Sequence, residues 1–262
     1  MSNTWITVLG ISFIFVMTTL GAAVVYFFKN DIPRKVNTMF LGFASGIMIA
    51  ASIWSLLLPA LDASANYGKL NWLPVVIGFG IGGLFLTFLD KVVPHRHKSA
   101  NVDEGPKSAL NNHTKLFLAV MIHNIPEGLA VGFAFGAAAL VGQNAAFISA
   151  LGLALGIGIQ NFPEGAAVAL PMRNYTKSRN KSFLFGMASG AVEPVAAVIG
   201  YFFAAYIAVL QPWLLAFAAG AMIFVVAEDL IPDSKLDEFP RLGAWGVMFG
   251  FAVMMILEIV FG

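Results

Sequence analysis

The 262-residue chain is 59% apolar, and Asp, Glu, Lys and Arg together make up 11% of it. An average soluble domain carries roughly 25% charged residues, so this composition excludes a soluble domain and indicates lipid as the surrounding solvent. The net charge of +1 is spread over several loops, which gives no reason to expect nucleic acid as a partner. Because the chain has no cysteine, disulfides, thiolate metal ligands and thiol catalysis are excluded.

Eight apolar runs are long enough to cross a bilayer as helices that close their own backbone hydrogen bonds. We therefore predict an all-α membrane protein in which 1–262 form a single polytopic domain. The first run lacks a basic start and is too long for a signal peptide, so we expect a retained span. The runs lie at about 4–28, 36–61, 73–93, 114–139, 145–172, 181–207, 211–231 and 241–261.

Lys and Arg gather in every second loop, whereas the alternate loops hold Lys69. Basic residues favour the cytoplasmic side of short loops, so the pattern predicts an even number of spans with both termini outside. The loop 94–113, which carries histidines, is then cytoplasmic. We expect the membrane to be the bacterial cytoplasmic (inner) membrane.

A short internal similarity links the second span to the seventh. Residues 44–48 (Ala-Ser-Gly-Ile-Met) resemble 218–222 (Ala-Ala-Gly-Ala-Met), and these two spans cross in opposite directions. Opposite crossing is typical of inverted repeats, whose interfaces often hold transport sites. The similarity predicts an inverted repeat of spans 1–3 and 6–8 around the central spans 4 and 5.

Two nearly identical hexads lie in spans four and five: His-Asn-Ile-Pro-Glu-Gly at 123–128 and Gln-Asn-Phe-Pro-Glu-Gly at 160–165. On a helix, the first two residues of each hexad share a face with its glutamate. Each hexad proline removes a helical hydrogen bond, which frees a carbonyl about one turn earlier. The polar members are His123, Asn124, Glu127, Gln160, Asn161 and Glu164.

A third intramembrane carboxylate, Glu193, lies in the sixth span beside Pro194. A carboxylate in the membrane is costly unless it faces a partner, and no Lys or Arg lies deep in a span to pair with these three. The missing positive charge points to a divalent cation from outside the chain. Imidazole together with carboxylates favours a transition metal over calcium or magnesium.

The paired hexads, the eight spans and the histidine-bearing loop resemble the ZIP (Zrt/Irt-like) metal transporters, especially their GufA-like branch. The resemblance covers nearly the whole chain. It implies transport of Zn²⁺, or of Cd²⁺, Fe²⁺ or Mn²⁺, toward the cytoplasm by an elevator-like displacement of one helix group. It implies no enzyme activity and no cofactor besides the transported ion.

The resemblance also implies two adjacent metal sites, with Glu127 and Glu164 bridging both. This chain has Gln160 where many members have a second histidine, and Asn161 where some prokaryotic members have Asp. The first site would use His123, Glu127, Gln160, Glu164 and Met48. The second would use Asn124, Glu127, Asn161, Glu164 and Glu193.

Further residues are candidates for the transport pathway, and four of them have a plainer alternative. Glu228 and Asp229 fit either an exit path or a solvated helix end, and His95 and His97 fit either loose metal binding or a solvated loop. Ser45 and Ser52 of the second span are also candidates. The expected partners are divalent metal ions and the lipid bilayer, and we allow for a homodimer.

The same residues are compatible with three other hypotheses about function. A selective divalent-cation channel would use the same ligands without alternating access. An intramembrane metalloenzyme would use metal-bound water beside a glutamate, although the His-Glu-x-x-His pattern is absent. A metal-gated receptor or structural membrane protein is the third.

Overall fold

A computed structural model describes residues 2–27, 33–96, 103–110, 112–233 and 238–261. Within these ranges, eight helices are long and apolar enough to cross a membrane, which confirms the predicted all-α membrane class. The spans are Asn3–Tyr26, Arg34–Ala63, Trp72–Val92, Phe117–Val141, Asn144–Arg173, Arg179–Tyr206, Gln211–Leu230 and Pro240–Phe261.

The elements follow one another along the chain with short connections. They are α1 (Asn3–Ala23), η1 (Val24–Tyr26), α2 (Arg34–Ala51), η2 (Ser52–Leu57), α3 (Leu58–Ala63), η3 (Ala65–Leu70), α4 (Trp72–Val92), β1 (His95–Arg96), β2 (Asp103–Glu104), α5 (Asn112–Val141), α6 (Asn144–Thr176), α7 (Arg179–Gly190), α8 (Val192–Tyr206), η4 (Ala208–Leu210), α9 (Gln211–Val225), η5 (Val226–Leu230), α10 (Ile231–Asp233) and α11 (Pro240–Phe261).

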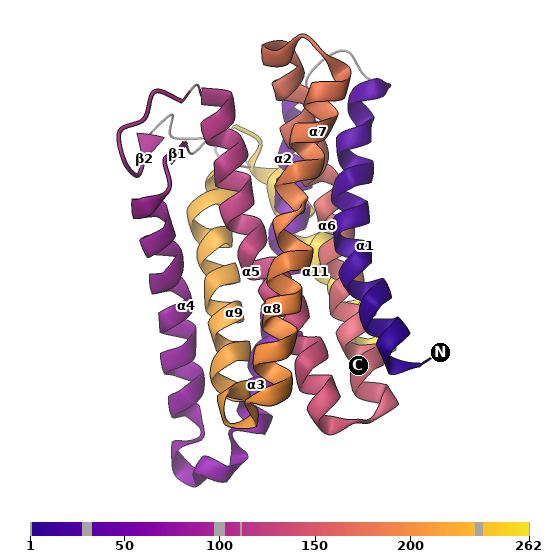
Figure 1. Cartoon of the computed structure of the whole chain (residues 1–262), viewed down its shortest axis with the longest axis vertical. Helices are drawn as coiled ribbons and strands as arrows, with labels where there is room; N and C mark the ends of the chain where they lie inside the picture. Colours follow the sequence, from indigo (N-terminus) through magenta and orange to yellow (C-terminus); the bar gives the residue numbers. More distant parts are fainter. Residues whose placement is uncertain (1, 28–32, 97–102, 111, 234–237, 262) are drawn as a thin grey trace.

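The spans form one bundle of roughly parallel rods, and the two chain ends lie at the same end of it (Figure 1). The most apolar windows of the second and seventh spans are 61% buried, and those of the fourth and fifth are 56% buried, against 17% for the eighth. Spans two, four, five and seven therefore form the interior. The others present more of their apolar surface outward, as expected where lipid is the solvent.

Four helix pairings dominate the bundle: α5 with α8, α1 with α6, α2 with α11, and α4 with α9. Each rests on glycines that let two backbones approach closely, a common means of packing helices in membranes. The glycines at these contacts include Gly128, Gly132 and Gly136 of α5, Gly21 and Gly165 of the α1–α6 pair, Gly46 and Gly250 of the α2–α11 pair, and Gly82 and Gly220 of the α4–α9 pair.

These pairings bear on the predicted inverted repeat. If the repeat relates spans one to three with six to eight, and span four with five, the pairing of spans one and five corresponds to that of six and four. The pairing of two and eight likewise corresponds to that of seven and three. Both correspondences are among the four main pairings. The repeat itself stays a prediction.

Spans two and seven share a feature that the sequence analysis did not anticipate. Each passes from α-helix into a π-helical segment, η2 or η5, before continuing as α3 or α10. Both segments begin eight residues after the start of the internal similarity (52 − 44 = 8 and 226 − 218 = 8). A π-helical turn widens the helix, and such turns frequently accompany functional sites.

The sixth span is broken between α7 and α8, directly before Glu193. Pro194 has no amide hydrogen to donate to Gly190, so the first helix ends there and α8 starts at Val192. Proline is tolerated in the first turn of the new helix. Glu193 thereby lies at the amino end of α8, where the helix dipole favours negative charge.

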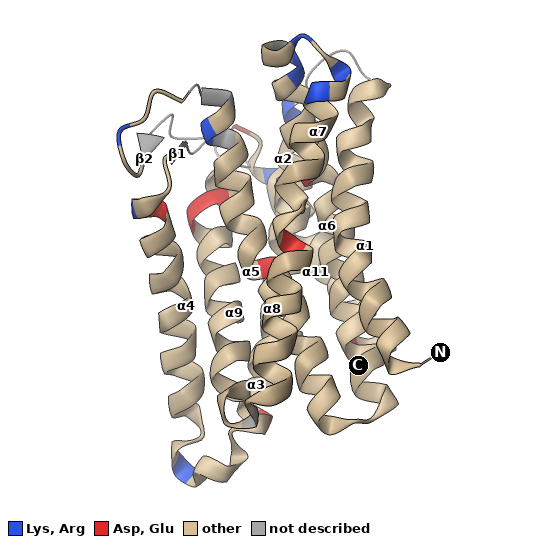
Figure 2. Ribbon diagram, viewed as in Figure 1, with Lys and Arg blue, Asp and Glu red and all other residues tan. Residues whose placement is uncertain are grey.

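Lys and Arg gather at one end of the bundle, around the α6–α7 turn and the segment between α4 and α5 (Figure 2). We call this the basic end; the chain termini mark the opposite end. Within the segment 94–113, expected as a loop, β1 and β2 pair antiparallel and α5 already begins at Asn112. Acidic residues also lie in the middle of α5 and near the start of α8 (Figure 2).

Candidate metal centre

The two hexads, 123–128 on α5 and 160–165 on α6, lie in the interior of the bundle and form what we call the hexad layer. Asn124, Gln160 and Asn161 are fully buried, and Glu127 is 1% exposed. Glu164 and His123 are half-buried. Both hexad prolines lie inside uninterrupted helices.

Glu193 of α8 is fully buried and lies between the two hexads. Its Oε1 accepts a hydrogen bond from Asn124 Nδ2 at 3.1 Å, and its Oε2 accepts one from Asn161 Nδ2 at 2.6 Å. A third donor, which the sequence analysis missed, is the hydroxyl of Thr18 on α1, 3.1 Å from Oε1. Three neutral donors from three helices thus hold one carboxylate.

The two asparagines are oriented by backbone carbonyls as well. Asn124 Nδ2 also donates to the Ser189 carbonyl at 3.0 Å, and Asn161 Nδ2 to the Ile14 carbonyl at 3.4 Å. A carbonyl can only accept, so these contacts fix which side of each amide carries nitrogen. The amide oxygen of each asparagine consequently faces away from Glu193 and from the carbonyl that accepts from its nitrogen.

Three buried oxygens of the hexad layer have no hydrogen-bond partner among the described residues: Asn124 Oδ1, Glu127 Oε2 and Gln160 Oε1. Buried polar atoms are nearly always satisfied, and each exception requires an explanation such as an ion. All three are acceptors, and none can donate while Glu127 is ionised. A cation is the kind of partner that buried acceptors of this sort lack.

The carboxylates are near enough to act on one another. Glu127 interacts electrostatically with Glu164 and Glu193, and the Gln160 side chain is within hydrogen-bonding reach of Glu127. Yet no group of three His, Cys, Asp or Glu side chains converges tightly enough, within the described ranges, to hold an ion by itself. Amide oxygens, or a shift of one helix, would have to complete a metal site.

His123 shares a helix face with Glu127 in the sequence pattern, but its hydrogen-bonding partner in the structure is another carboxylate. Its Nε2 lies 3.0 Å from Asp229 Oδ2 in the π-helical segment η5. It also interacts electrostatically with Glu164 and with Asp90 of α4. The histidine therefore links the hexad layer to acidic groups on the way to the basic end.

Of the second-span candidates, Met48, Ser45 and Ser52 are fully buried. Both hydroxyls donate to carbonyls of their own helix: Ser45 to Leu41 at 2.8 Å and Ser52 to Met48 at 2.7 Å. Met48 packs in the main apolar cluster.

At the basic end, Asp229 is 6% exposed, whereas Glu228 beside it is exposed. Only the first of these two candidates therefore faces the interior. His95 begins β1, which packs against α5. His97 lies outside the described residues.

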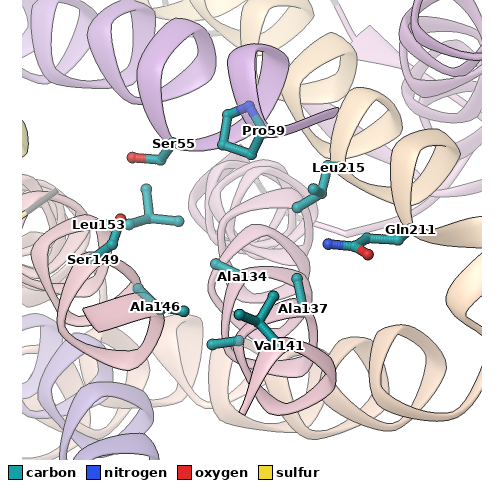
Figure 3. A pocket seen from close by; sticks show the side chains of 12 residues that line it. Ser55, Pro59, Ala134, Ala137, Val141, Ala146, Ser149, Leu153, Gln211 and Leu215 are labelled. Carbon is teal, nitrogen blue, oxygen red and sulfur yellow. The ribbon is translucent and has the colours of Figure 1, made fainter. Parts of the chain in front are cut away.

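A cavity of about 150 Å³ lies at the opposite end, between α5, α6, α9 and the end of the second span. Figure 3 shows Ser55, Ser149 and Gln211 among mainly aliphatic side chains around the hollow. Ala134 and Leu153, which line it, are seven residues from Glu127 and Gln160 (134 − 127 = 7; 160 − 153 = 7), about 10 Å along each helix. The cavity thus ends about two helical turns from the hexad layer.

Glu258, to which the sequence assigned no role, forms a hydrogen bond with Ser55 at this cavity. Neither this contact nor the one between Thr18 and Glu193 could be predicted from the sequence. Each joins residues far apart along the chain, and neither Ser55 nor Thr18 belongs to a motif. An acidic residue without a basic companion in the last span was the one available signal.

Comparison with known proteins gives a consistent result. Residues 114–258 match the family model described as ZIP Zinc transporter. The chain is 37% identical to zinc transporter ZIPB of Bordetella bronchiseptica over 95% of this chain and 79% of that protein. It is 35% identical to zinc transporter GufA of Myxococcus xanthus over 94% of both, and 34% identical to human zinc transporter ZIP11 over 100% of this chain and 98% of the relative. The chain belongs to the ZIP family of zinc transporters.

Proposed function

We propose that this protein carries divalent transition-metal ions, zinc first among them, across a membrane by binding them in the hexad layer. The observation that carries the proposal is the set of unsatisfied buried oxygens on Asn124, Glu127 and Gln160. A buried acceptor without a partner costs about 1–3 kcal/mol, so three in one layer favour a cation as their partner. Transport by the named relatives supports zinc as that cation.

The chemistry of the available ligands agrees with this assignment. The layer offers carboxylate and amide oxygens together with one imidazole, that of His123. Zinc binds nitrogen and oxygen ligands at about 2.0–2.2 Å. Cadmium, iron and manganese are further candidate substrates, because the same ligand types suit several divalent transition metals.

We further infer a binuclear arrangement. The first site would use His123, Glu127, Gln160, Glu164 and Met48, and the second Asn124, Glu127, Asn161, Glu164 and Glu193. Both asparagines hydrogen-bond Glu193 through their amide nitrogens, so these three residues of the second site already lie together. Each amide would have to turn its oxygen toward the ion, because an amide N–H only donates. Loading that site requires Glu193 to exchange hydrogen bonds for a metal ligand bond.

The pathway that we propose runs from the cavity beside Ser55 through the hexad layer to Asp229 and Glu228 at the basic end. The positive-inside tendency makes the basic end cytoplasmic, which puts both termini and the cavity outside and the 94–113 segment inside. Transport toward the cytoplasm then proceeds from cavity to basic end. For a bacterial chain, the membrane would be the cytoplasmic (inner) one.

The test is zinc uptake into proteoliposomes. Glu127→Ala and Glu164→Ala are each expected to reduce saturable uptake to the level of empty vesicles, because each removes an oxygen shared by both sites. Asp62→Ala serves as the matched control, since Asp62 is an exposed carboxylate far from the layer and should leave uptake unchanged. Full uptake in both glutamate variants would refute the proposed site, and uptake that never saturates would favour a channel.

A further inference from the structure

Thr18 belongs to α1, a helix that carries no hexad and no charged residue. Its side chain is nevertheless 1% exposed and faces the hexad layer. Its hydroxyl lies 3.1 Å from Glu193 Oε1 and 3.2 Å from the carbonyl oxygen of Ile14 in its own helix. Thr18 is thus the link from the first span to the carboxylate that both asparagines hold.

Close packing fixes Thr18 in this position. A methyl group added at Gly165, the last residue of the second hexad, would lie 2.1 Å from the Thr18 carbonyl oxygen. One added at Gly190, where α7 ends, would lie 2.7 Å from Thr18 Cβ and Cγ2. Two glycines therefore allow α1 to approach α6 and the α7–α8 break closely enough for the hydroxyl to reach Glu193.

The hydroxyl has one proton and two acceptors at nearly equal distance. The Ile14 carbonyl also receives Asn161 Nδ2 at 3.4 Å, so it is already partly satisfied. Donation to Glu193 is therefore the better use of the proton while the site is empty. When a cation takes Glu193 Oε1, the proton can turn to Ile14 without leaving an unsatisfied group.

We propose that Thr18 is a positioning residue for the metal site: its hydroxyl holds the Glu193 carboxylate in place between the two asparagines until a metal ion binds. This inference rests on the proposed function. A side chain that orients a ligand affects how tightly the ion binds more than how fast the loaded protein moves. Thr18 acts through Glu193 and does not itself touch the metal.

The experiment compares the KM and Vmax of zinc uptake in proteoliposomes for Thr18→Val and Thr18→Ser. Valine keeps the shape but has no hydroxyl, and we expect it to raise the KM about tenfold with Vmax largely retained, the scale of one hydrogen bond to a charged group. Serine keeps the hydroxyl and should restore the KM of the unaltered protein. Thr19→Val is the matched control, because the Thr19 hydroxyl donates to Phe15 of its own helix at 2.9 Å.

A double-variant comparison tests the route of the effect. In a Glu193→Gln background, Thr18→Val should no longer change zinc affinity, read as zinc-dependent thermal stabilisation of the purified protein. An unchanged KM for Thr18→Val, a loss of Vmax alone, or the same loss of affinity in both backgrounds would overturn the inference. Glu127→Ala and Glu164→Ala are measured alongside. If both retain full uptake, the proposed metal site fails. If both abolish uptake while Thr18→Val has the KM of the unaltered protein, the inference about Thr18 alone fails.

Discussion

The hexads of α5 and α6 differ by two residues in six, and their shared asparagines and glycines make matching contacts. Each asparagine donates to Glu193 and to one backbone carbonyl of a neighbouring helix. Each terminal glycine admits another backbone: Gly128 that of α8 at Glu193, and Gly165 that of α1 at Thr18. The repeated residues therefore build one symmetric cradle around a single carboxylate.

The first residues of the two hexads behave differently. Gln160 stays within the layer, where its Nε2 donates to Asn161 at 3.3 Å and its oxygen is left unsatisfied. His123, in contrast, contacts Asp229 on η5, nearer the basic end. The asparagines and glycines therefore shape the site, whereas the first hexad position connects one side of it to the basic end.

The largest expected effect comes from removing both asparagine amides. In Asn124→Leu with Asn161→Leu, the buried Glu193 carboxylate loses two of its three donors, and we expect the free energy of unfolding to fall by about 3–5 kcal/mol. Denaturant titration of the purified protein in detergent measures this. Adding Glu193→Met should restore most of the lost stability, because the buried charge is then absent. If the double asparagine variant is as stable as the unaltered protein, the asparagines do not support Glu193.

The glycines at the ends of the hexads provide the next test of the symmetry. A methyl group would lie 2.3 Å from the Glu193 carbonyl oxygen in Gly128→Ala and 2.1 Å from that of Thr18 in Gly165→Ala. We expect each to lower the free energy of unfolding by about 1–3 kcal/mol, because overpacking forces the helices apart. Gly80→Ala on α4 is the control, since open space surrounds that position. A loss of stability in only one of the two variants would show that the two hexads are not packed in the same way.

Exchanging the first residues separates their roles. His123→Gln should raise the KM for zinc about tenfold and that for manganese less, because imidazole favours zinc over manganese. Gln160→His should lower the KM for zinc, because it adds a nitrogen ligand to the layer. Competition uptake with both ions measures the shift. Equal changes for both metals would contradict a ligand role for the imidazole.

The smallest effect is expected from Asp229→Asn. The amide oxygen can still accept from His123 Nε2 while the negative charge is lost. We expect the Vmax of zinc uptake to fall by about twofold to fivefold, the difference between a charged and a neutral hydrogen-bond acceptor, with KM nearly constant. A larger change in KM than in Vmax would make Asp229 part of the binding site itself.

The sequence predicted much of this molecule because the bilayer leaves few choices. Apolar runs of membrane length allow hardly any structure except helices, so the eight spans followed from composition and spacing. The hexads were recognisable because their polar residues recur at helical spacing, and Glu193 because a carboxylate deep in a span is costly.

Contacts between distant segments could not be predicted in the same way. The hydrogen bond from Thr18 to Glu193 joins residues 175 positions apart. The contact of His123 with Asp229 depends on the π-helical segment η5, which no sequence pattern predicted. The prediction placed Asn124 and Asn161 with Glu193 as ligands of one metal ion, but it included neither their donation to Glu193 nor the contribution of Thr18. Helix packing, governed by glycines at close contacts, sets these details.

Binding of zinc in the hexad layer can be observed by anomalous diffraction of crystals soaked with zinc, recorded at the zinc absorption edge. We expect density between α5 and α6 within bonding distance, about 2.0–2.2 Å, of Glu127 Oε2 and the amide oxygen of Asn124 or Gln160. Clear zinc density elsewhere in the molecule, with these three oxygens still unoccupied at saturating zinc, would contradict it.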